Sequence, residues 1–305
     1  MILLVGANGY VGSYFQVFFE QKNLIWRPFD WRLFLSANRS NLISQLRASK
    51  ATFLINCAGY TGKPNVDVCE LNKTECFNGN VVLTRRIREV CESINLGWGH
   101  VSSGCIFSGE RKRGEGWQED DVPNFTFSRP PCSFYSGTKA LAEEALGWGA
   151  SPRSVDNLAS WKHESEPSGY VWRLRIPFDE KNNPRNYLFK LQNYDSLLEA
   201  RNSLSQLREF VSACWQCVEQ KVPFGIYNVT NPGSVTTSEV VGMIQKLGVS
   251  QKSFSFFDSE EAFMKEVAKT PRSNCVLDTS KLEGLGILMR PVHDAIEWSL
   301  KNWRK

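Results

Sequence analysis

The hydrophobic residues of the chain alternate between short apolar runs and amphipathic stretches over most of its length. Strand–helix alternation at this spacing is typical of α/β proteins, so we predict a Rossmann-type, doubly wound parallel sheet. Short apolar runs that predict buried strands lie at residues 2–5, 24–29, 53–57, 100–107 and 170–177. Stretches with apolar residues three and four positions apart, which predict helices, lie at 13–22, 41–49, 67–78, 80–95 and 136–147.

The pattern changes after Pro177, where the apolar segments become shorter. We predict a nucleotide-binding domain at 1–177 and a smaller, mostly helical substrate-binding lobe at 178–305. The stretches 108–133 and 148–168 lack periodicity, and we expect surface loops there, near the mouth of a pocket. The elements expected after Pro177 are a helix carrying Leu188, Leu191 and Tyr194, a helix at about 204–222, a strand at 224–230 that returns to the main sheet, and helices opened by capping boxes at Thr236 to Glu239 and Asp258 to Glu261.

A glycine-rich sequence follows the first predicted strand at once and precedes an amphipathic helix. Glycines let the backbone turn tightly and approach a pyrophosphate, whose charge the N–H groups of a helix N-terminus attract. In this context the pattern Gly-x-x-Gly-x-x-Gly predicts dinucleotide binding. The residues expected at the cofactor in this turn are Gly6, Asn8, Gly9, Tyr10, Val11 and Gly12.

The choice of dinucleotide depends on three residues in and just after the second predicted strand, 24–29. Asp30 lies near the distance at which an acidic residue contacts the adenosine ribose, which favours NADH. Arg27 and Arg32 flank it and could hold a 2′-phosphate. We favour NADPH as the cofactor, with NADH as the alternative.

Composition excludes several classes of protein. The net charge of +4 over 305 residues is too mild for nucleic-acid binding, although it suits a substrate with a diphosphate. No apolar run of about 18 residues exists, and the chain starts on a predicted core strand, so we expect a cytoplasmic protein without a membrane span. Nine cysteines without framework spacing fit reduced thiols, and Cys214 and Cys217 fit buried helix positions better than a metal site. We expect no metal site.

A Tyr-x-x-x-Lys pair with an upstream serine predicts proton delivery during ketone reduction. Hydride transfer to a ketone leaves an alkoxide, and Tyr135 can protonate it once the charge of Lys139 lowers a phenol pKa that is ordinarily about 10. Ser103, at the end of a predicted strand, can hydrogen-bond the same oxygen. Cys105, two residues after that serine, adds a second acid/base group to this pocket.

Several longer segments carry a resemblance to a known family. Through these segments the chain resembles the extended short-chain dehydrogenase/reductases. Among these it most closely resembles the bifunctional UDP-4-keto-6-deoxyglucose 3,5-epimerase/4-keto-reductases that make UDP-L-rhamnose. The stretches 127–132 and 147–168 look like insertions. The matching segments are Asn56 to Asp67, Gly104 to Phe107, Pro123 to Thr126, Ser133 to Tyr135, Asn183 to Asn186, Gly225 to Gly233 and Pro271 to Asn274.

The resemblance implies roles that residue types alone do not. It implies that Cys105 and Lys190 form the epimerisation acid/base pair, whereas residue type alone suggests a small buried cysteine and a solvated lysine. It implies a UDP-4-keto-6-deoxy sugar as the substrate, and we expect a homodimer. Further residues expected at the cofactor are Cys57, Ala58 and Gly59, and those expected at the substrate are Thr61, Asn65, Asn186, Arg272 and Asn274.

Three alternatives stay open at this point. A monofunctional dTDP-4-keto-rhamnose reductase would share Ser103, Tyr135 and Lys139 but would not need Cys105 or Lys190. An epimerase/reductase of the GDP-fucose type would keep the cysteine and use histidine in place of Lys190. A non-catalytic, dinucleotide-binding regulatory subunit could keep the fold, although retention of all five reactive side chains argues against it.

Overall fold

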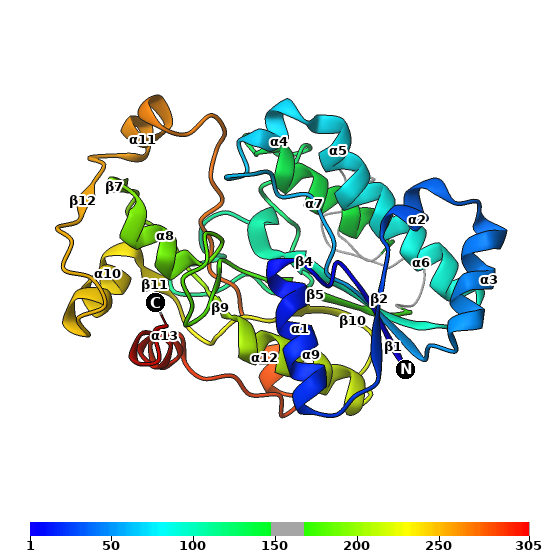
Figure 1. Ribbon diagram of the computed structural model, residues 1–305. Coiled ribbons are helices and arrows are strands. Elements are labelled where there is room, and N and C mark those ends of the chain that lie inside the picture. The colour runs from blue at the N-terminus through cyan, green and yellow to red at the C-terminus, as the bar shows by residue number, and fades with distance from the viewer. Residues whose placement is uncertain (148–167, 305) are drawn as a thin grey trace.

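The computed structural model describes residues 1–147 and 168–304, and its centre is a parallel β-sheet (Figure 1). The sheet has six strands in the order β10-β5-β4-β3-β1-β2, and every neighbouring pair is parallel. This topology confirms the predicted Rossmann-type sheet. The strands are β1 (Ile2–Val5), β2 (Trp26–Phe29), β3 (Phe53–Asn56), β4 (Gly97–Ser103), β5 (Tyr170–Leu174) and β10 (Gly225–Asn228).

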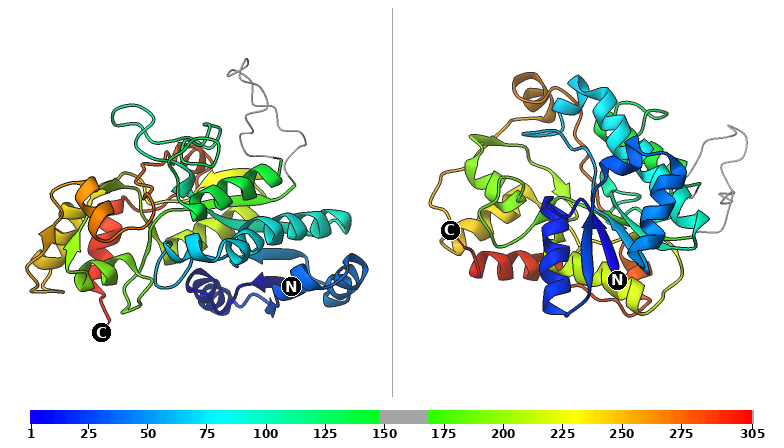
Figure 2. Two further views of the ribbon diagram at one scale, coloured as in Figure 1. Left: turned by 90° about the horizontal axis from the view of Figure 1, so that it is seen from above. Right: turned by 45° about the vertical axis from the view of Figure 1, so that its right-hand side comes forward.

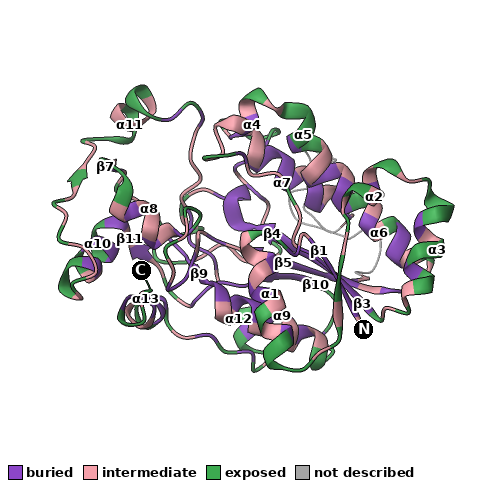
Figure 3. Ribbon diagram, in the orientation of Figure 1, coloured by how far each residue is buried: buried purple, intermediate pink, exposed green. Residues whose placement is uncertain are grey.

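Helices cover both faces of the sheet because alternate residues of each strand point to opposite sides. In β1, Ile2 and Leu4 pack with α1 (Tyr10–Gln21) and α9 (Leu207–Glu219). Leu3 and Val5 pack on the other side, with α3 (Arg39–Ser49) and α6 (Leu83–Ser93). Figures 2 and 3 show the buried strands between these two helical layers. The remaining helices near the sheet are α2 (Arg32–Ser36), α4 (Val68–Leu71), α5 (Lys73–Phe77), α7 (Phe134–Ala145) and α12 (Ser280–Glu283).

The C-terminal part forms a second core beside the sheet, on the left in Figure 1. Leu188, Leu191, Val240, Ile244 and Ile296 meet in this core. Its helices are α8 (Tyr187–Asn193), α10 (Thr237–Lys246), α11 (Glu260–Glu266) and α13 (Val292–Lys301). Its short strands pair as β6 (Pro177–Phe178) with β9 (Ser205–Gln206), β7 (Ser196–Leu197) with β12 (Ser255–Phe256), and β8 (Arg201–Asn202) with β11 (Val235–Thr236).

The chain after residue 177 contributes to both cores. β10 lies at the edge of the main sheet beside β5, where we expected the strand at 224–230 to return. α9 packs on α1, and Leu282 and Ile287 join the same core. The division into domains at residue 177 stays a prediction. Residues after 177 belong to both cores, so no single position in the sequence divides one core from the other.

Several predicted boundaries are corrected by local hydrogen bonding. The strand expected at 100–107 ends at Ser103, because the Ser103 side chain accepts a hydrogen bond from the Cys105 N–H and Gly104–Ile106 turn into a 3₁₀ helix. The helices expected at 67–78 and 80–95 are instead α4, α5, a π-helical turn at Asn78–Val82, and α6.

The two predicted capping boxes have different outcomes. Thr236 and Glu239 form the expected box at the start of α10. At α11 the box predicted from Asp258 is wrong, since Ser259 is the N-cap and accepts from the N–H of Ala262. The insertion predicted at 147–168 falls, apart from its two end residues, outside the described residues. No helix in the described parts of the chain has the length and hydrophobicity needed to cross a bilayer.

Candidate active site

The turn between β1 and α1 leaves no room for a side chain at two of its glycines. Gly6 has φ +77°, and a Cβ there would lie 2.5 Å from the backbone nitrogen of Ala58. A Cβ at Gly12 would lie 2.2 Å from the carbonyl oxygen of Gly6. The turn therefore brings the start of α1, which no side chain caps, against the segment after β3 at the carboxyl edge of the sheet. Ligands of α/β proteins bind at this edge, so the turn has the shape that a dinucleotide pyrophosphate requires.

The residues expected to select the cofactor lie at the end of β2. The Asp30 carboxylate accepts a hydrogen bond from the Arg32 N–H at 3.0 Å and lies 3.3 Å from Nη1 of the same arginine. Arg27 is inside β2, opposite Leu3, and is exposed. Arg32 is therefore placed beside the carboxylate expected to contact ribose, and Arg27 lies further from the carboxyl edge.

Ser103 and Tyr135 meet at the end of β4. Ser103 is the last residue of this strand, Tyr135 lies in the first turn of α7, and the Ser103 hydroxyl is close enough to act on the Tyr135 phenol. Burial raises the pKa of the Tyr135 phenol well above its ordinary value, and the contact with Ser103 opposes this effect. The expectation that Lys139 gives Tyr135 a lowered pKa is thus wrong for the net shift. The phenol is protonated at neutral pH, as a proton donor must be, but its raised pKa makes it a weaker acid than an exposed tyrosine.

Lys139 is buried beside His100. Its Nζ lies 3.4 Å from Nε2 of His100 and donates to the Val101 carbonyl at 3.3 Å. The Asn56 Oδ1 accepts from the Ala58 N–H, so the Asn56 Nδ2 faces Nδ1 of His100 at 2.9 Å, and we assign the His100 hydrogen to Nε2. Burial and the charge of Lys139 lower the pKa of His100 well below its ordinary value, which keeps the ring neutral. Asn56 and His100 are directly paired between β3 and β4, a register that the sequence did not reveal.

Cys105 follows Ser103 in the 3₁₀ turn and is 6% exposed. Burial raises the pKa of its thiol, whereas hydrogen bonds with Ser103 and Ser136 and the charges of Arg175 and Lys139 lower it. The pKa of the thiol is raised overall, because burial outweighs the neighbouring groups that favour its anionic form. This side chain can exchange a proton with a molecule bound against Ser103 and Tyr135.

Lys190 lies on α8, in the C-terminal part. Burial lowers the pKa of its ammonium group, and the nearby charges of Arg185 and Arg272 lower it further. Asn186 caps this helix, because its Oδ1 accepts from the Leu188 N–H at 3.0 Å. The Asn186 Nδ2 donates to the Asp179 carboxylate at 2.7 Å, so its amide is used within the fold.

Side-chain hydrogen bonds from two arginines join the C-terminal part to the segment after β3. The Arg185 Nη1 donates to Oγ1 of Thr61 at 2.8 Å. Arg272 makes two hydrogen bonds to the carboxylate of Asp67, at 2.6 and 2.8 Å. Several residues expected at the substrate, with Lys190, therefore lie around one positively charged junction. Asn65 turns the chain beside it, with its Oδ1 accepting from the Asp67 N–H at 2.9 Å.

The structure thus divides the expected reactive residues into two groups. Ser103, Cys105, Tyr135 and Lys139 lie together where β4 meets α7. Lys190 lies with the arginines of the junction, and no hydrogen bond joins it to Cys105 in residues 1–147 and 168–304. The Oδ1 of Asn274 accepts a hydrogen bond from Nδ2 of Asn202 at 3.2 Å. The same described residues contain no group of three or more His, Cys, Asp or Glu side chains that could hold a metal ion.

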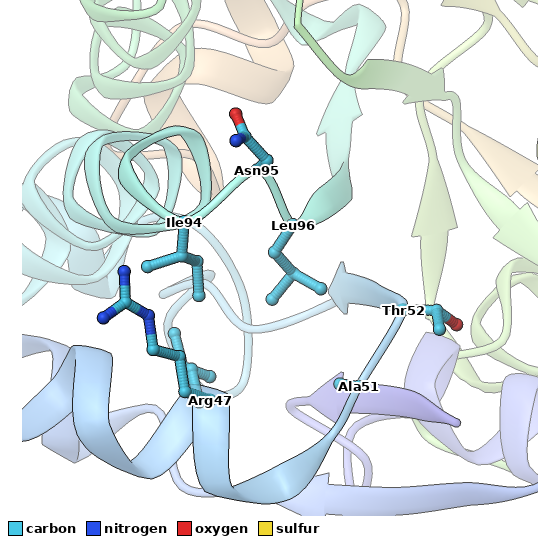
Figure 4. Close-up of a pocket in the computed structure, with 7 residues that line it drawn as sticks. Arg47, Ala51, Thr52, Ile94, Asn95 and Leu96 are labelled. Carbon is cyan, nitrogen blue, oxygen red and sulfur yellow. The ribbon is translucent and has the colours of Figure 1, made fainter.

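A surface pocket of about 440 Å³ lies at the opposite edge of the sheet (Figure 4). It is lined in part by Ala51 and Thr52, which precede β3, and by Asn95 and Leu96, which precede β4. Because the strands are parallel, this is the amino edge, away from Ser103 and the glycine turn. The pocket is therefore separate from the candidate active site.

Comparison with known proteins identifies relatives along most of the chain. The family model described as the RmlD substrate binding domain matches residues 1–166. The trifunctional UDP-glucose 4,6-dehydratase/UDP-4-keto-6-deoxy-D-glucose 3,5-epimerase/UDP-4-keto-L-rhamnose-reductase RHM1 of Arabidopsis thaliana is 32% identical over 92% of this chain, which spans 39% of that protein. The bifunctional dTDP-4-dehydrorhamnose 3,5-epimerase/dTDP-4-dehydrorhamnose reductase of the same plant is 30% identical, over 92% of this chain and 86% of its own.

Solved structures share the fold at lower identity. The L780 UDP-rhamnose synthase of Acanthamoeba polyphaga mimivirus has a TM-score of 0.85 at 22% identity, over 99% of both chains. A dTDP-4-dehydrorhamnose reductase of Bacillus anthracis in complex with NADP has a TM-score of 0.73 at 19% identity, over 99% of this chain and 97% of its own. MoeE5 in complex with UDP-glucuronic acid and NAD has a TM-score of 0.72 at 17% identity, over 98% of both chains.

Proposed function

We propose a function from the premise that the chain belongs to the family of the RmlD substrate-binding domain, with rhamnose synthases and dTDP-4-dehydrorhamnose reductases as its relatives. The proposed reaction is epimerisation at carbons 3 and 5 of UDP-4-keto-6-deoxyglucose, followed by NADPH-dependent reduction of the 4-keto group to give UDP-L-rhamnose. The observation that carries it is the contact of Ser103, Tyr135 and Cys105 at the end of β4. This contact supports the proposal because a proton donor and a thiol that lie together could both act on one bound ketone.

The residues of the glycine turn and of the segment after β3 fit a nicotinamide dinucleotide. Gly6, Gly9 and Gly12 would hold the pyrophosphate, and Ala58 and Gly59 would lie beside it, since a Cβ at Gly6 would already touch the backbone of Ala58. When bound, the dinucleotide supplies the hydride that reduces the ketone. Arg32, beside Asp30, supports NADPH over NADH because a guanidinium can hold the 2′-phosphate.

In the reduction, the chain supplies the proton and holds the ketone. Tyr135 donates its proton to the oxygen at carbon 4; because burial raises the pKa of this phenol, a positive charge close by is needed to assist the release. Ser103 donates a hydrogen bond to the same oxygen and stabilises the charge that develops there. Lys139, whose Nζ donates to the Val101 carbonyl, holds its amine one helical turn after Tyr135.

In the epimerisation, the 4-keto group acidifies the protons on carbons 3 and 5. Cys105 removes such a proton as a thiolate, and Lys190 returns one to the other face as an ammonium group. The lowered pKa of Lys190 suits this role, because a proton leaves it more readily than it leaves an exposed lysine. The charge of Arg185, Lys190 and Arg272 suits the diphosphate of the substrate. A homodimer and a cytoplasmic location remain predictions.

Product analysis tests this function. The protein is incubated with UDP-4-keto-6-deoxyglucose or its dTDP counterpart and with NADPH, and the sugar is identified by NMR. We expect UDP-L-rhamnose from the UDP substrate. A reduced sugar that keeps the D-configuration would support the monofunctional reductase, and turnover of the dTDP substrate alone would contradict the proposed nucleotide. Absence of NADPH oxidation with both substrates would contradict the reductase function.

A further inference from the structure

Arg175 is a buried cation without a carboxylate partner among the described residues. It is 6% exposed; its Nη2 donates to Oδ1 of Asn202 at 2.7 Å and to the Ser273 carbonyl, and its Nε is buried with no hydrogen-bond partner. The charge of Arg173, two residues earlier, is instead balanced by an ion pair with Glu143 at 2.7 Å. Burying an unpaired charge is costly, so an unpaired guanidinium indicates that an anion belongs beside it.

The strand register places Arg175 next to the turn that holds Cys105. In the pairing of β4 with β5, Ser103 lies opposite Leu174, so the next residues along, Gly104 and Arg175, leave the sheet side by side. The segment that holds the guanidinium is tied to the same turn. Ser273 donates through its hydroxyl to the Phe107 carbonyl at 2.6 Å, and the Cys275 thiol donates to the Gly104 carbonyl at 3.2 Å.

The charge of Arg175 lowers the pKa of two thiols, those of Cys105 and Cys275. The two thiols differ in their hydrogen bonds. Cys275 donates its S–H to a carbonyl, which requires the neutral thiol. Cys105 makes no such bond to a carbonyl in residues 1–147 and 168–304, and the Ser103 and Ser136 hydroxyl groups beside it oppose the raising effect of burial on its pKa. Cys105 is therefore the thiol arranged to become the missing anion.

We propose that Arg175 is the counter-ion that stabilises the thiolate of Cys105 and thereby makes this side chain a base for carbon-bound protons. The proposal rests on the epimerase function proposed above. The thiolate accepts the proton and becomes a neutral thiol, while the electron pair of the C–H bond passes to the 4-keto oxygen as an enolate. Arg175 acts through Cys105, so it is a positioning residue and touches no reacting atom.

Other groups also face the Cys105 sulfur, and the test has to separate them from Arg175. Lys139 adds a second positive charge from α7. The groups that face or interact with Cys105 are Ser103 of β4, Tyr135, Ser136 and Lys139 of α7, Cys69 of α4, Cys132 before α7, Cys275, and Arg175 itself. Only substitutions at or beside the guanidinium change the contribution of Arg175.

The rate of alkylation by iodoacetamide, measured against pH for the peptide that contains Cys105, gives the pKa of this thiol without any substrate. Arg175→Gln should raise that pKa by about 1 to 3, as loss of a neighbouring charge does. Arg175→Lys, which keeps the charge, should leave it near the wild-type value. Asn202→Asp places a carboxylate on the guanidinium and should also raise the pKa, and it serves where Arg175→Gln does not fold. The peptide that contains Cys275 is the internal control.

An unchanged pH profile for Cys105 in Arg175→Gln, or in Asn202→Asp where the first variant does not fold, would overturn the proposal. The epimerase function is tested separately by deuterium exchange into the 4-keto sugar. Loss of exchange in Cys105→Ala, combined with an unaltered thiol pKa in Arg175→Gln, would refute the role of Arg175 alone. Exchange that persists in Cys105→Ala would refute the epimerase function, whatever the alkylation profile shows.

Discussion

Replacing glycines of the β1–α1 turn with alanine tests whether its backbone geometry creates the cofactor site. Gly6 combines φ +77° with a Cβ position 2.5 Å from the Ala58 nitrogen, whereas Gly114 has φ +81° and nothing within 4 Å. Gly114→Ala therefore carries only the cost of the left-handed backbone, about 1 to 2 kcal/mol. Gly6→Ala adds the steric conflict, about 1 to 3 kcal/mol by analogy with overpacked cores, for a total of about 2 to 5 kcal/mol.

Gly12→Ala separates the steric part from the backbone part. Its Cβ would lie 2.2 Å from the Gly6 carbonyl, and Gly12 is inside α1, where alanine gains about 1 kcal/mol of helix propensity. We expect the gain to be outweighed by displacement of the turn. Urea unfolding gives the free energies, and titration of protein fluorescence gives the dissociation constant for NADPH. Gly6→Ala and Gly12→Ala should weaken binding at least about tenfold, which is 1.4 kcal/mol, and Gly114→Ala should not. Equal stability loss and unchanged binding in all three variants would refute the reasoning.

Three further predictions address the site. Tyr135→Phe should lower 4-keto reduction by about 10²- to 10⁴-fold with NADPH binding retained, and near wild-type NADPH oxidation would remove the assignment. Arg32→Ala should weaken binding of NADPH more than binding of NADH. Arg27→Ala should have a smaller effect on NADPH binding, because Arg27 lies inside β2. An equal loss of affinity for both cofactors would mean that neither guanidinium holds the phosphate. His100 has a lowered pKa when folded, so the unfolded state binds a proton first and stability falls as pH drops below about 6.5, by up to about 1.4 kcal/mol per pH unit. His100→Gln should flatten that part of the stability curve relative to wild type, and an identical slope in both proteins would contradict a buried neutral ring.

The main features of the fold could be predicted because they depend on local pattern. Apolar runs and helical periodicity gave the strands of the parallel sheet, and the glycine turn was recognisable from its position between a strand and a helix. The end of β4 was less accessible, since Ser103 stops the strand through one side-chain hydrogen bond while the apolar pattern continues to Phe107. A pattern of apolar residues contains no information about such a side-chain hydrogen bond.

The missed residues of the site depend on pairing between distant parts of the chain. His100 is polar on a buried strand, and its meaning appears only when the register places it against Asn56. Arg175 has no carboxylate partner among the described residues. This lack depends on which side chains surround the arginine in the fold, so the sequence could not reveal it. Asn186 was expected at the substrate, and the structure shows that its side chain also caps a helix, which its place in the sequence pattern did not indicate.

The central claim, that one site carries both proton exchange and reduction, is tested most directly by deuterium exchange without reductant. UDP-4-keto-6-deoxyglucose is incubated in deuterated water with the wild-type protein or Cys105→Ala, and the deuterium at carbons 3 and 5 is measured by NMR. We predict exchange at both carbons with wild type, and none with Cys105→Ala even though that variant still binds NADPH. Exchange at both carbons at the wild-type rate in Cys105→Ala would contradict the account and leave a plain reductase as the better description.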